Sequence, residues 1–405
     1  MQKLDITKIL DKSFEKDYVA EDLSVLFEEK ATQYGLSVSQ ARDLLGIEYK
    51  SLTPLLNGTA KQPNLINVLK LADFLDIDLN VLLTSIVSQQ TPENTAKLQE
   101  ARNVSFIGKN FDVERLQKEG LLPKKADSNV IVQKILDFFG FDSMAEYEEF
   151  DKRICNVAFS SSKRTFVDKM RRFSINSGFR LFEAIKNPYP YDEKKLIDLL
   201  PKIKPYSQDV ENGLFTVCQA LFSHGVTIIF QRHLPTTQFR GATFFINDKP
   251  CIIITDFMKN YATIWRVLMH ELYHVIFDEE DIKKEGYHLT GEMQLTLIDE
   301  EAPENFASDF FVDNSEFKYI KPHIYSEVMV KAFAKKIKVH PSLIYMKYQV
   351  HMATVENKNY WGAFKKQFPN YELAVNRLNP ISWKQDNSIL EISKALKVIY
   401  EIVEP

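Results

Sequence analysis

Cysteine is scarce in this sequence of 405 residues. Only Cys155, Cys218 and Cys251 occur, far apart and odd in number, which excludes a disulfide framework and a cysteine-based metal site. Long apolar runs are also missing, because nowhere do about 18 uncharged apolar residues follow one another. The first residues lead into mixed charged sequence rather than a secretory signal. We therefore expect a soluble, cytoplasmic protein that has no membrane partner.

Neither sign of charge is in large excess, since the formal net charge is -4. Such a balance gives no global attraction to nucleic acid or to an anionic membrane, so any such binding must come from a local patch. Hydrophobic residues make up 45% of the chain, and the length is sufficient for two or three domains with cores of their own.

Three regions differ in pattern. Residues 1–90 have the spacing of short helices broken by glycine and proline, 91–210 are mostly helical, and 211–405 combine short strands with helices. The spacing predicts helices at 129–139, 144–154, 166–185, 193–200, 210–224, 263–277, 299–311, 324–336, 341–349 and 387–403. It predicts strands at 225–230, 241–246 and 251–255, with a hairpin turn at Asn247-Asp248. Strands followed by a block of helices indicate a mostly helical α+β protein.

The run His270-Glu271-Leu272-Tyr273-His274 is an HExxH motif inside an apolar stretch. Histidines four residues apart lie on one face of a helix and can reach one zinc ion. Glu271 would then act as a general base and acid, taking a proton from water and passing it to a leaving amine. HExxH also occurs by chance, but two unpaired histidines in an apolar helix would be unfavourable without a metal. The context therefore favours a zinc site.

A catalytic zinc site needs a third protein ligand. In the acidic segment that follows, Glu300 lies on the same helical face as Pro303 and Ala307, and an inward carboxylate is unfavourable unless it meets a cation. We therefore predict Glu300 as the third ligand. Glu301 and Glu304 are interpreted as solvated charges in the first turn of a helix, where the helix dipole favours them. Both remain alternative ligands.

The strand pair, the HExxH helix and the run NFASDFFV at 305–312 together resemble the ImmA/IrrE family of metallopeptidases. The family pattern E-x-E-A-N/D-x-F-A, aligned on Phe306-Ala307, places its first glutamate on Glu300. The sequence departs from that pattern at Ala302-Pro303-Glu304, and a shift of one residue would move the ligand to Glu301. The resemblance covers about 210–350. It implies a gluzincin-like domain at 211–405 that binds Zn2+ and cleaves a protein partner, commonly a DNA-binding repressor.

The runs GLSVSQARDLLGI at 35–47 and SLTPLLNG at 51–58 resemble the helix-turn-helix of lambda-repressor-like (XRE) domains. The resemblance implies an all-helical domain at 1–90 whose second motif helix, about 48–57, enters the major groove. The candidate DNA contacts are Tyr49, Lys50, Ser51, Thr53 and Lys61.

Two features speak against DNA binding by this domain. From 21 to 90 five cations face nine anions, a net charge of -4, whereas affinity for DNA rests on neutralising phosphates. Pro54 also removes a backbone hydrogen bond inside the proposed recognition helix. Both DNA binding and reuse of the domain for protein interaction or dimerisation, including a homodimer, therefore stay open.

These patterns predict a zinc metallo-endopeptidase that cleaves a protein partner, a transcriptional repressor, within a stress, phage or mobile-element switch. His270, His274 and Glu300 would hold the metal and Glu271 would be catalytic, with Tyr261 and Tyr273 as candidates for helping at the developing oxyanion. One alternative is a non-catalytic DNA-binding regulator or antitoxin-like protein that keeps a structural metal site. Another is a toxin that acts by proteolysis.

Overall fold

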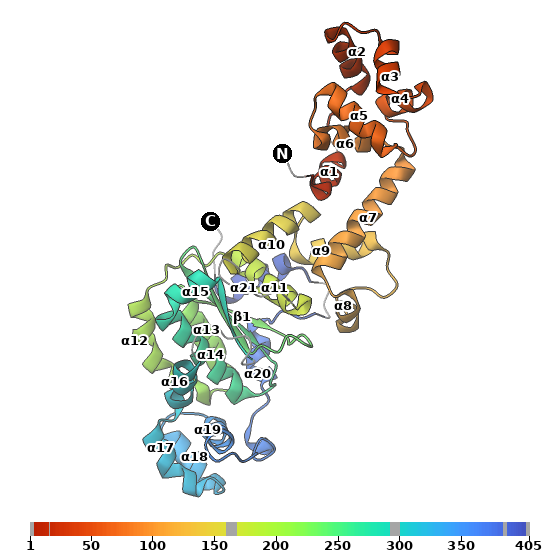
Figure 1. Ribbon diagram of the computed structural model, residues 1–405. Helices are drawn as coiled ribbons and strands as arrows, with labels where there is room; N and C mark the ends of the chain where they lie inside the picture. The colour runs from red at the N-terminus through yellow and green to blue at the C-terminus, as the bar shows by residue number, and fades with distance from the viewer. Residues whose placement is uncertain (1–3, 16, 159–167, 292–299, 384–386, 402–405) are drawn as a thin grey trace. The chain divides into compact units, whose positions relative to one another are not determined.

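The computed structural model describes residues 4–15, 17–158, 168–291, 300–383 and 387–401 (Figure 1). The chain divides into two compact units, Met1–Asn110 with Ala126–Val132, and Phe111–Lys125 with Gln133–Pro405. The region expected as a separate middle part, 91–210, is thus divided between them. The described residues are mostly helical and include one small mixed sheet, which is the α+β class predicted from the sequence.

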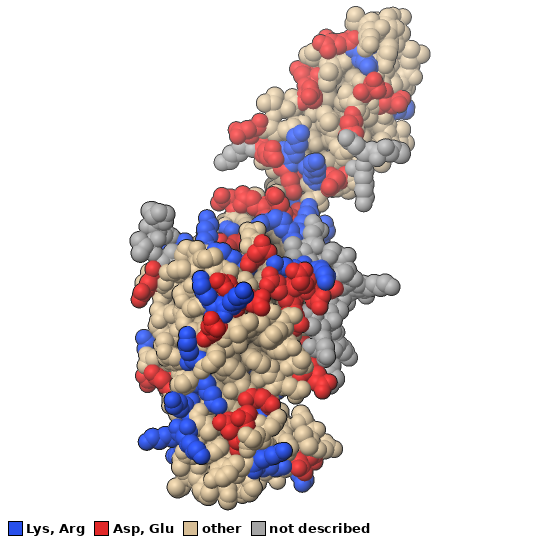
Figure 2. All heavy atoms as spheres, turned by 90° about the vertical axis from the view of Figure 1, so that its left-hand side faces the viewer, with Lys and Arg blue, Asp and Glu red and all other residues tan. Residues whose placement is uncertain are grey.

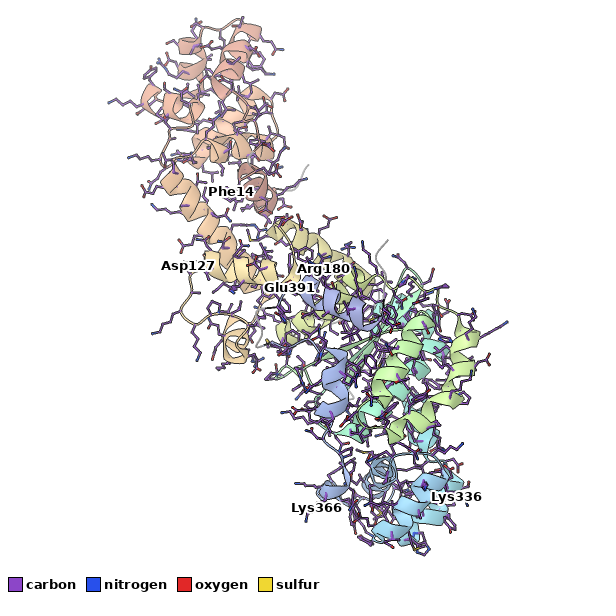
Figure 3. All side chains as sticks on the ribbon, turned by 180° about the vertical axis from the view of Figure 1, so that it is seen from behind. Phe14, Asp127, Arg180, Lys336, Lys366 and Glu391 are labelled. Carbon is purple, nitrogen blue, oxygen red and sulfur yellow. The ribbon has the colours of Figure 1, made fainter. Side chains whose placement is uncertain are left out.

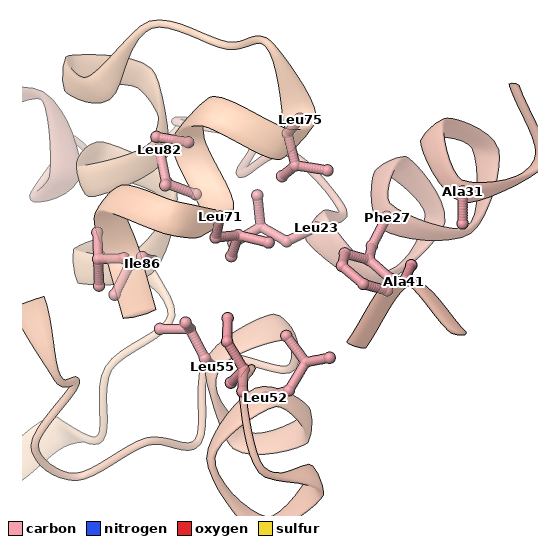
Figure 4. Close-up of a cluster of buried hydrophobic side chains, with 13 residues drawn as sticks. Leu23, Phe27, Ala31, Ala41, Leu52, Leu55, Leu71, Leu75, Leu82 and Ile86 are labelled. Carbon is pink, nitrogen blue, oxygen red and sulfur yellow. The ribbon is translucent and has the colours of Figure 1, made fainter. Parts of the chain in front are cut away.

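The first unit consists of helices. They are α1 (Ile6–Ser13), α2 (Leu23–Gln33), α3 (Val38–Leu45), α4 (Tyr49–Leu56), α5 (Leu65–Leu75), α6 (Leu79–Ser88) and α7 (Pro92–Asn110). Helices α2 to α6 enclose an apolar cluster in which Leu23, Phe27, Leu71 and Leu82 are fully buried (Figure 4). Side-chain caps set the starts of α2, α3, α5 and α6, and Ser37 forms a capping box at α3. The five helices α2 to α6 therefore share an apolar core.

The second unit holds the remaining elements. Its helices are α8 (Val113–Glu119), α9 (Ser128–Phe139, which begins in the first unit), α10 (Met144–Ala158), α11 (Lys169–Ile185), α12 (Glu193–Ile203), α13 (Gly213–Ser223), α14 (Tyr261–Phe277), α15 (Glu279–Glu285), α16 (Glu301–Phe311), α17 (Asn314–Ile320), α18 (Glu327–Lys336), α19 (Pro341–Thr354), α20 (Glu372–Val375) and α21 (Ile389–Ile399). Four short 3-10 helices accompany them, η1 (Lys204–Gln208), η2 (Lys321–His323), η3 (Lys365–Gln367) and η4 (Asn376–Leu378).

Several of these helices begin later than predicted because a polar residue caps them. Ser326 accepts from the Met329 N–H, so α18 begins at Glu327 rather than at 324. Asp168 caps α11 in the same way, and residues 166 and 167 of the predicted helix lie outside the described part of the chain. Helices α11 and α21, which carry the labelled Arg180 and Glu391, pack against each other (Figure 3).

The sheet has the strand order β1-β3-β2-β4, with β1 (Thr227–Gln231), β2 (Gly241–Ile246), β3 (Lys249–Thr255) and β4 (Tyr287–Thr290). Strand β3 pairs parallel with β1 and antiparallel with β2, whose other edge pairs antiparallel with β4. The β2–β3 turn is the predicted hairpin, and Asn247 and Asp248 both have positive φ, as a type I′ turn requires. Strand β4 was not predicted.

Helices cover both faces of the sheet (Figure 1). On one face, Phe179 of α11 stacks on Phe244 of β2 with ring centroids 3.8 Å apart. On the other face, Thr243 of β2 contacts Glu271 of α14. Alternate residues of a strand point to opposite faces, so β2 separates the α11 layer from the α14 layer. Among the described helices, none combines the length and apolar character needed to cross a membrane.

Candidate metal centre

Helix α14 positions the histidine pair of the HExxH motif. Asn260 caps its first turn by accepting from the Thr263 N–H, and most of the helix is buried between the sheet and α16. His270 and His274 are 2% and 0% exposed. Their Nε2 atoms lie 3.1 Å apart, so the two rings point into the same volume. The four-residue spacing on one helical face accounts for this convergence.

Glu300 reaches the same volume from the start of α16. It is the residue before the first helical turn, and its carbonyl accepts from the Glu304 N–H at 3.1 Å. Its Oε2 lies 2.8 Å from His270 Nε2. The structure therefore brings Glu300 to the two histidines. Glu301, the first alternative, is exposed.

Glu304, the second alternative, is not the solvated charge that the sequence suggested. It forms an ion pair with Arg266 of α14, and its Oε1 lies 3.8 Å from His270 Nδ1. Glu304 thus faces the outer nitrogen of the His270 ring, whereas Glu300 faces the inner one. This contact depends on the packing of α16 against α14, which a helical charge pattern does not reveal.

His288 is a member of the cluster that the sequence analysis missed. It lies on β4, pairs in register with Thr243, and is 3% exposed. Its Nε2 lies 2.6 Å from Glu300 Oε1, and its ring centroid lies 4.1 Å from that of His274. The run Tyr287-His288-Leu289-Thr290 does contain aromatic and β-branched residues typical of a strand, but it is too short to stand out.

His270, His274, His288 and Glu300 form a group that could hold a metal ion. Each offers one ligand atom, and these atoms all lie within 4.8 Å of one another. His288 Nε2 and Glu300 Oε1 are buried, and despite their closeness neither makes a hydrogen bond within the described part of the chain. Buried polar atoms normally have partners. A cation bound between them would satisfy both, and imidazole with carboxylate is a donor set suited to first-row divalent metals.

Burial and mutual proximity set the protonation of this cluster. Burial, together with the neighbouring His288 and His270, lowers the pKa of His274 to about 2. Burial raises the pKa of Glu300, but His270 and His288 outweigh this effect and lower the pKa to about 2. For His270 burial is outweighed by Glu300 and Glu271, which raise its pKa. Glu300 is therefore ionised and His274 neutral near pH 7, and those are the forms that bind metal ions.

Carboxylates also contact the outer nitrogens of the two α14 histidines. Asp278, at the end of α14, lies with Oδ2 2.7 Å from His274 Nδ1. Because a carboxylate accepts, Nδ1 donates and Nε2 keeps its lone pair for the cluster. Glu304 lies on the corresponding side of His270. Carboxylates placed in this way orient metal-binding histidines and make them more basic.

Glu271 lies beside the cluster and is completely buried. Its Oε2 accepts from Thr243 Oγ1 at 2.7 Å, while its Oε1 has no hydrogen-bond partner among the described residues. Gly241 makes room for this carboxylate, because a Cβ at that position would lie 2.2 Å from Glu271 Oε1. Burial raises the pKa of Glu271, although His270 and His288 oppose the shift. A raised pKa suits a group that takes up and releases protons near neutral pH.

The two tyrosines considered for the oxyanion have other contacts. Tyr261 is buried and donates to the Ser207 carbonyl at 2.8 Å, so its hydroxyl serves the packing of α14 on η1. Tyr273 packs against Phe277 and Phe306.

The DNA-contact candidates all lie in the first unit. Tyr49, Lys50 and Ser51 are exposed in the first turn of α4, Thr53 is half-buried and Lys61 is exposed in the following loop. Figure 2 shows acidic side chains scattered over this unit, and no broad basic surface is visible on the face drawn.

The chain was compared with protein-family models, curated proteins and solved structures, and none of them matches.

Proposed function

We propose that this chain is a zinc-dependent endopeptidase that cleaves a protein partner, in line with its resemblance to ImmA/IrrE-type peptidases. The observation that carries the proposal is the position of Glu271. Its buried carboxylate lies next to the cluster of His270, His274 and Glu300, and no described residue forms a hydrogen bond with its Oε1. A structural metal site has no need of such a carboxylate, whereas hydrolysis of an amide needs a group that moves protons.

A zinc ion held by His270, His274 and Glu300 would supply Lewis-acid chemistry, polarising a peptide carbonyl and acidifying water. Glu271 takes the proton of the attacking water on its free Oε1 and delivers it to the leaving amine. Thr243 holds the other oxygen and so fixes the carboxylate during both transfers. Asp278 keeps His274 in the tautomer whose Nε2 would be available to a bound metal ion.

The test is the substitution Glu271→Gln, assayed with fluorescently labelled casein as an unstructured substrate. Glutamine keeps the shape and the hydrogen bond to Thr243 but cannot take up a proton. We expect cleavage to fall by about 10²-fold or more, since general acid–base catalysis contributes about 10²–10⁴-fold. Zinc content, measured by elemental analysis, should stay at the wild-type value. Cleavage unaffected by the substitution would refute the proposal.

A second candidate is a non-catalytic DNA-binding or antitoxin-like regulator that keeps a structural metal site. His288 favours it, because four protein ligands would close the coordination shell, as in structural zinc sites. This candidate predicts that Glu271→Gln and the wild type are equally inactive towards casein, whereas loss of the metal unfolds the second unit.

A further inference from the structure

Strand β4 pairs with β2 and so covers the edge of the sheet next to the candidate metal centre. Without it the sheet would end at β2, and β2 carries both Thr243 and Gly241, which contact Glu271. An open strand edge at such a place can take up an extended peptide as an added strand. Here the edge is already occupied, since Gly241, Ala242, Thr243 and Phe244 pair antiparallel with Thr290, Leu289, His288 and Tyr287.

The same strand brings a side chain into the metal cluster. His288 is the register partner of Thr243, and its Nε2 points at Glu300 Oε1 from 2.6 Å. Zinc in proteins prefers four ligands, and catalytic sites keep one position open for water or substrate. A metal bound by His270, His274, Glu300 and His288 would have no open position. Strand β4 therefore occupies the pairing edge that an endopeptidase must offer, and with a metal bound its His288 would also fill the fourth coordination position.

The attachment of β4 is local. The strand has four residues, and among the described strands it pairs only with β2. It follows Gly286, which ends α15 at a φ of +87°. No described strand lies beyond β4, so β4 is an edge strand. It can leave the sheet without breaking any strand pairing other than its own with β2. A substrate strand that replaced it would restore the backbone hydrogen bonds that β2 loses.

We propose that β4 is a built-in inhibitory strand which holds the place of the substrate, and that His288 is its blocking ligand. The inference rests on the proposed peptidase function. It also defines the substrate class, namely an extended protein segment that pairs antiparallel with residues 241–244 after β4 has left. A folded domain without an extended segment would not be cleaved.

Replacing the blocking ligand is the first test. In His288→Ala the fourth position is open to water, so casein cleavage should rise at least tenfold over the wild type. The second readout is the visible spectrum of the cobalt-substituted protein in the presence of azide. Azide should change the spectrum of His288→Ala and leave that of the wild type unaltered. If azide changes both spectra equally, His288 is not a ligand and the proposal falls.

A disulfide between β2 and β4 is the second test and does not alter the metal ligands. Ala242 and Leu289 are register partners on the sheet face that points away from Glu271. Directly paired residues in antiparallel strands lie about 4.5–5.5 Å apart at Cα, which suits a disulfide. In the double variant Ala242→Cys/Leu289→Cys, the oxidised form should cleave casein at least tenfold more slowly than the same protein after reduction. Equal rates would show that β4 does not occupy the substrate's place.

The two proposals fail in different ways. If His288→Ala/Glu271→Gln cleaves casein as fast as His288→Ala alone, the peptidase assignment is wrong. If Glu271→Gln abolishes cleavage but the oxidised and reduced double-cysteine proteins cleave equally, only the role of β4 is wrong. If neither the wild type nor His288→Ala cleaves casein, the peptidase assignment falls, and the azide experiment still decides whether His288 is a ligand.

Discussion

Gly241 of β2 leaves room for the side chain of Glu271, which lies on α14. A Cβ at position 241 would lie 2.2 Å from Glu271 Oε1, and Glu271 is completely buried, so its carboxylate has little space in which to move. We expect Gly241→Ala to displace the carboxylate from Thr243. Casein cleavage should then fall about tenfold or more, because a small misplacement of a catalytic group has large effects.

The matched control is Gly362→Ala, because a Cβ there meets nothing within 4 Å. Metal content should stay the same in both variants, since neither glycine touches a ligand atom. An unchanged rate in Gly241→Ala would mean that the position of Glu271 is not critical.

Asp278 supports the cluster from behind His274. Asp278→Asn keeps an oxygen that can accept from His274 Nδ1 but removes the negative charge. We expect the affinity for zinc, measured by competition with a chromophoric chelator, to fall about 10–100-fold, as is typical when such partners are lost. Asp281→Asn is the control, because Asp281 is exposed on α15 and pairs with Lys284. Equal zinc affinity in the two variants would contradict the role given to Asp278.

How far the site could be foreseen differs from residue to residue. His270 and His274 could be predicted as ligands because residues four apart lie on one face of a helix. Glu271 could be predicted because it directly follows the first of these histidines. Glu300 is found because an acidic residue on an apolar face needs a cation. His288 is not found, since its position depends on the register between β2 and β4. The pairing of Glu304 with Arg266 is likewise a tertiary contact between two helices.

At the scale of elements, α11 packs onto β3 through Gly178. A Cβ at this glycine would lie 2.2 Å from Ile253 Cδ1 in a fully buried layer. We therefore expect Gly178→Ala to lower the free energy of unfolding by about 1–3 kcal/mol, as overpacking usually does. The measurement is urea denaturation followed by circular dichroism.

The double variant Gly178→Ala/Ile253→Val tests the cause of this effect. Valine lacks the Cδ1 atom that the new methyl group meets, so the double variant should be more stable than Gly178→Ala. Ile253→Val alone should lose about 0.5–1.5 kcal/mol. Additive losses in the double variant would show that the two side chains do not collide.

The elements themselves are recovered to different degrees from the sequence. The β2–β3 hairpin is predicted because Asn247 and Asp248 tolerate the positive φ of a tight turn. The helix expected at 387–403 is observed at Ile389–Ile399, and residues 402 and 403 of that expectation lie outside the described part of the chain. Strand β4 is missed because four residues carry too little periodicity to be separated from a loop.

The metal cluster and helices α1 to α7 belong to different compact units. The sequence suggested three regions, since the pattern of helices and strands changes near 90 and 210. The contacts group the chain differently, because α7 joins the first unit and α10 to α12 join the second. A sequence pattern reflects local secondary structure. A folding unit is instead defined by the helices and strands whose apolar faces pack against one another. All four residues of the metal cluster belong to the second unit.

This division leads to a prediction about metal removal. A ligand that binds only the folded state stabilises it by about 2.7 kcal/mol when its concentration is 100 times its Kd. Adding a chelator should therefore lower the thermal transition of the second unit and leave that of the first unit unchanged. Calorimetry of the full chain measures both transitions. In His270→Ala the chelator should have little effect on this transition, because a metal ligand is missing. If the chelator lowered the transition of His270→Ala as much as that of the wild type, the metal would have to bind elsewhere. Acid should mimic the chelator in the wild type, since protons compete with the metal for the histidine nitrogens and for Glu300.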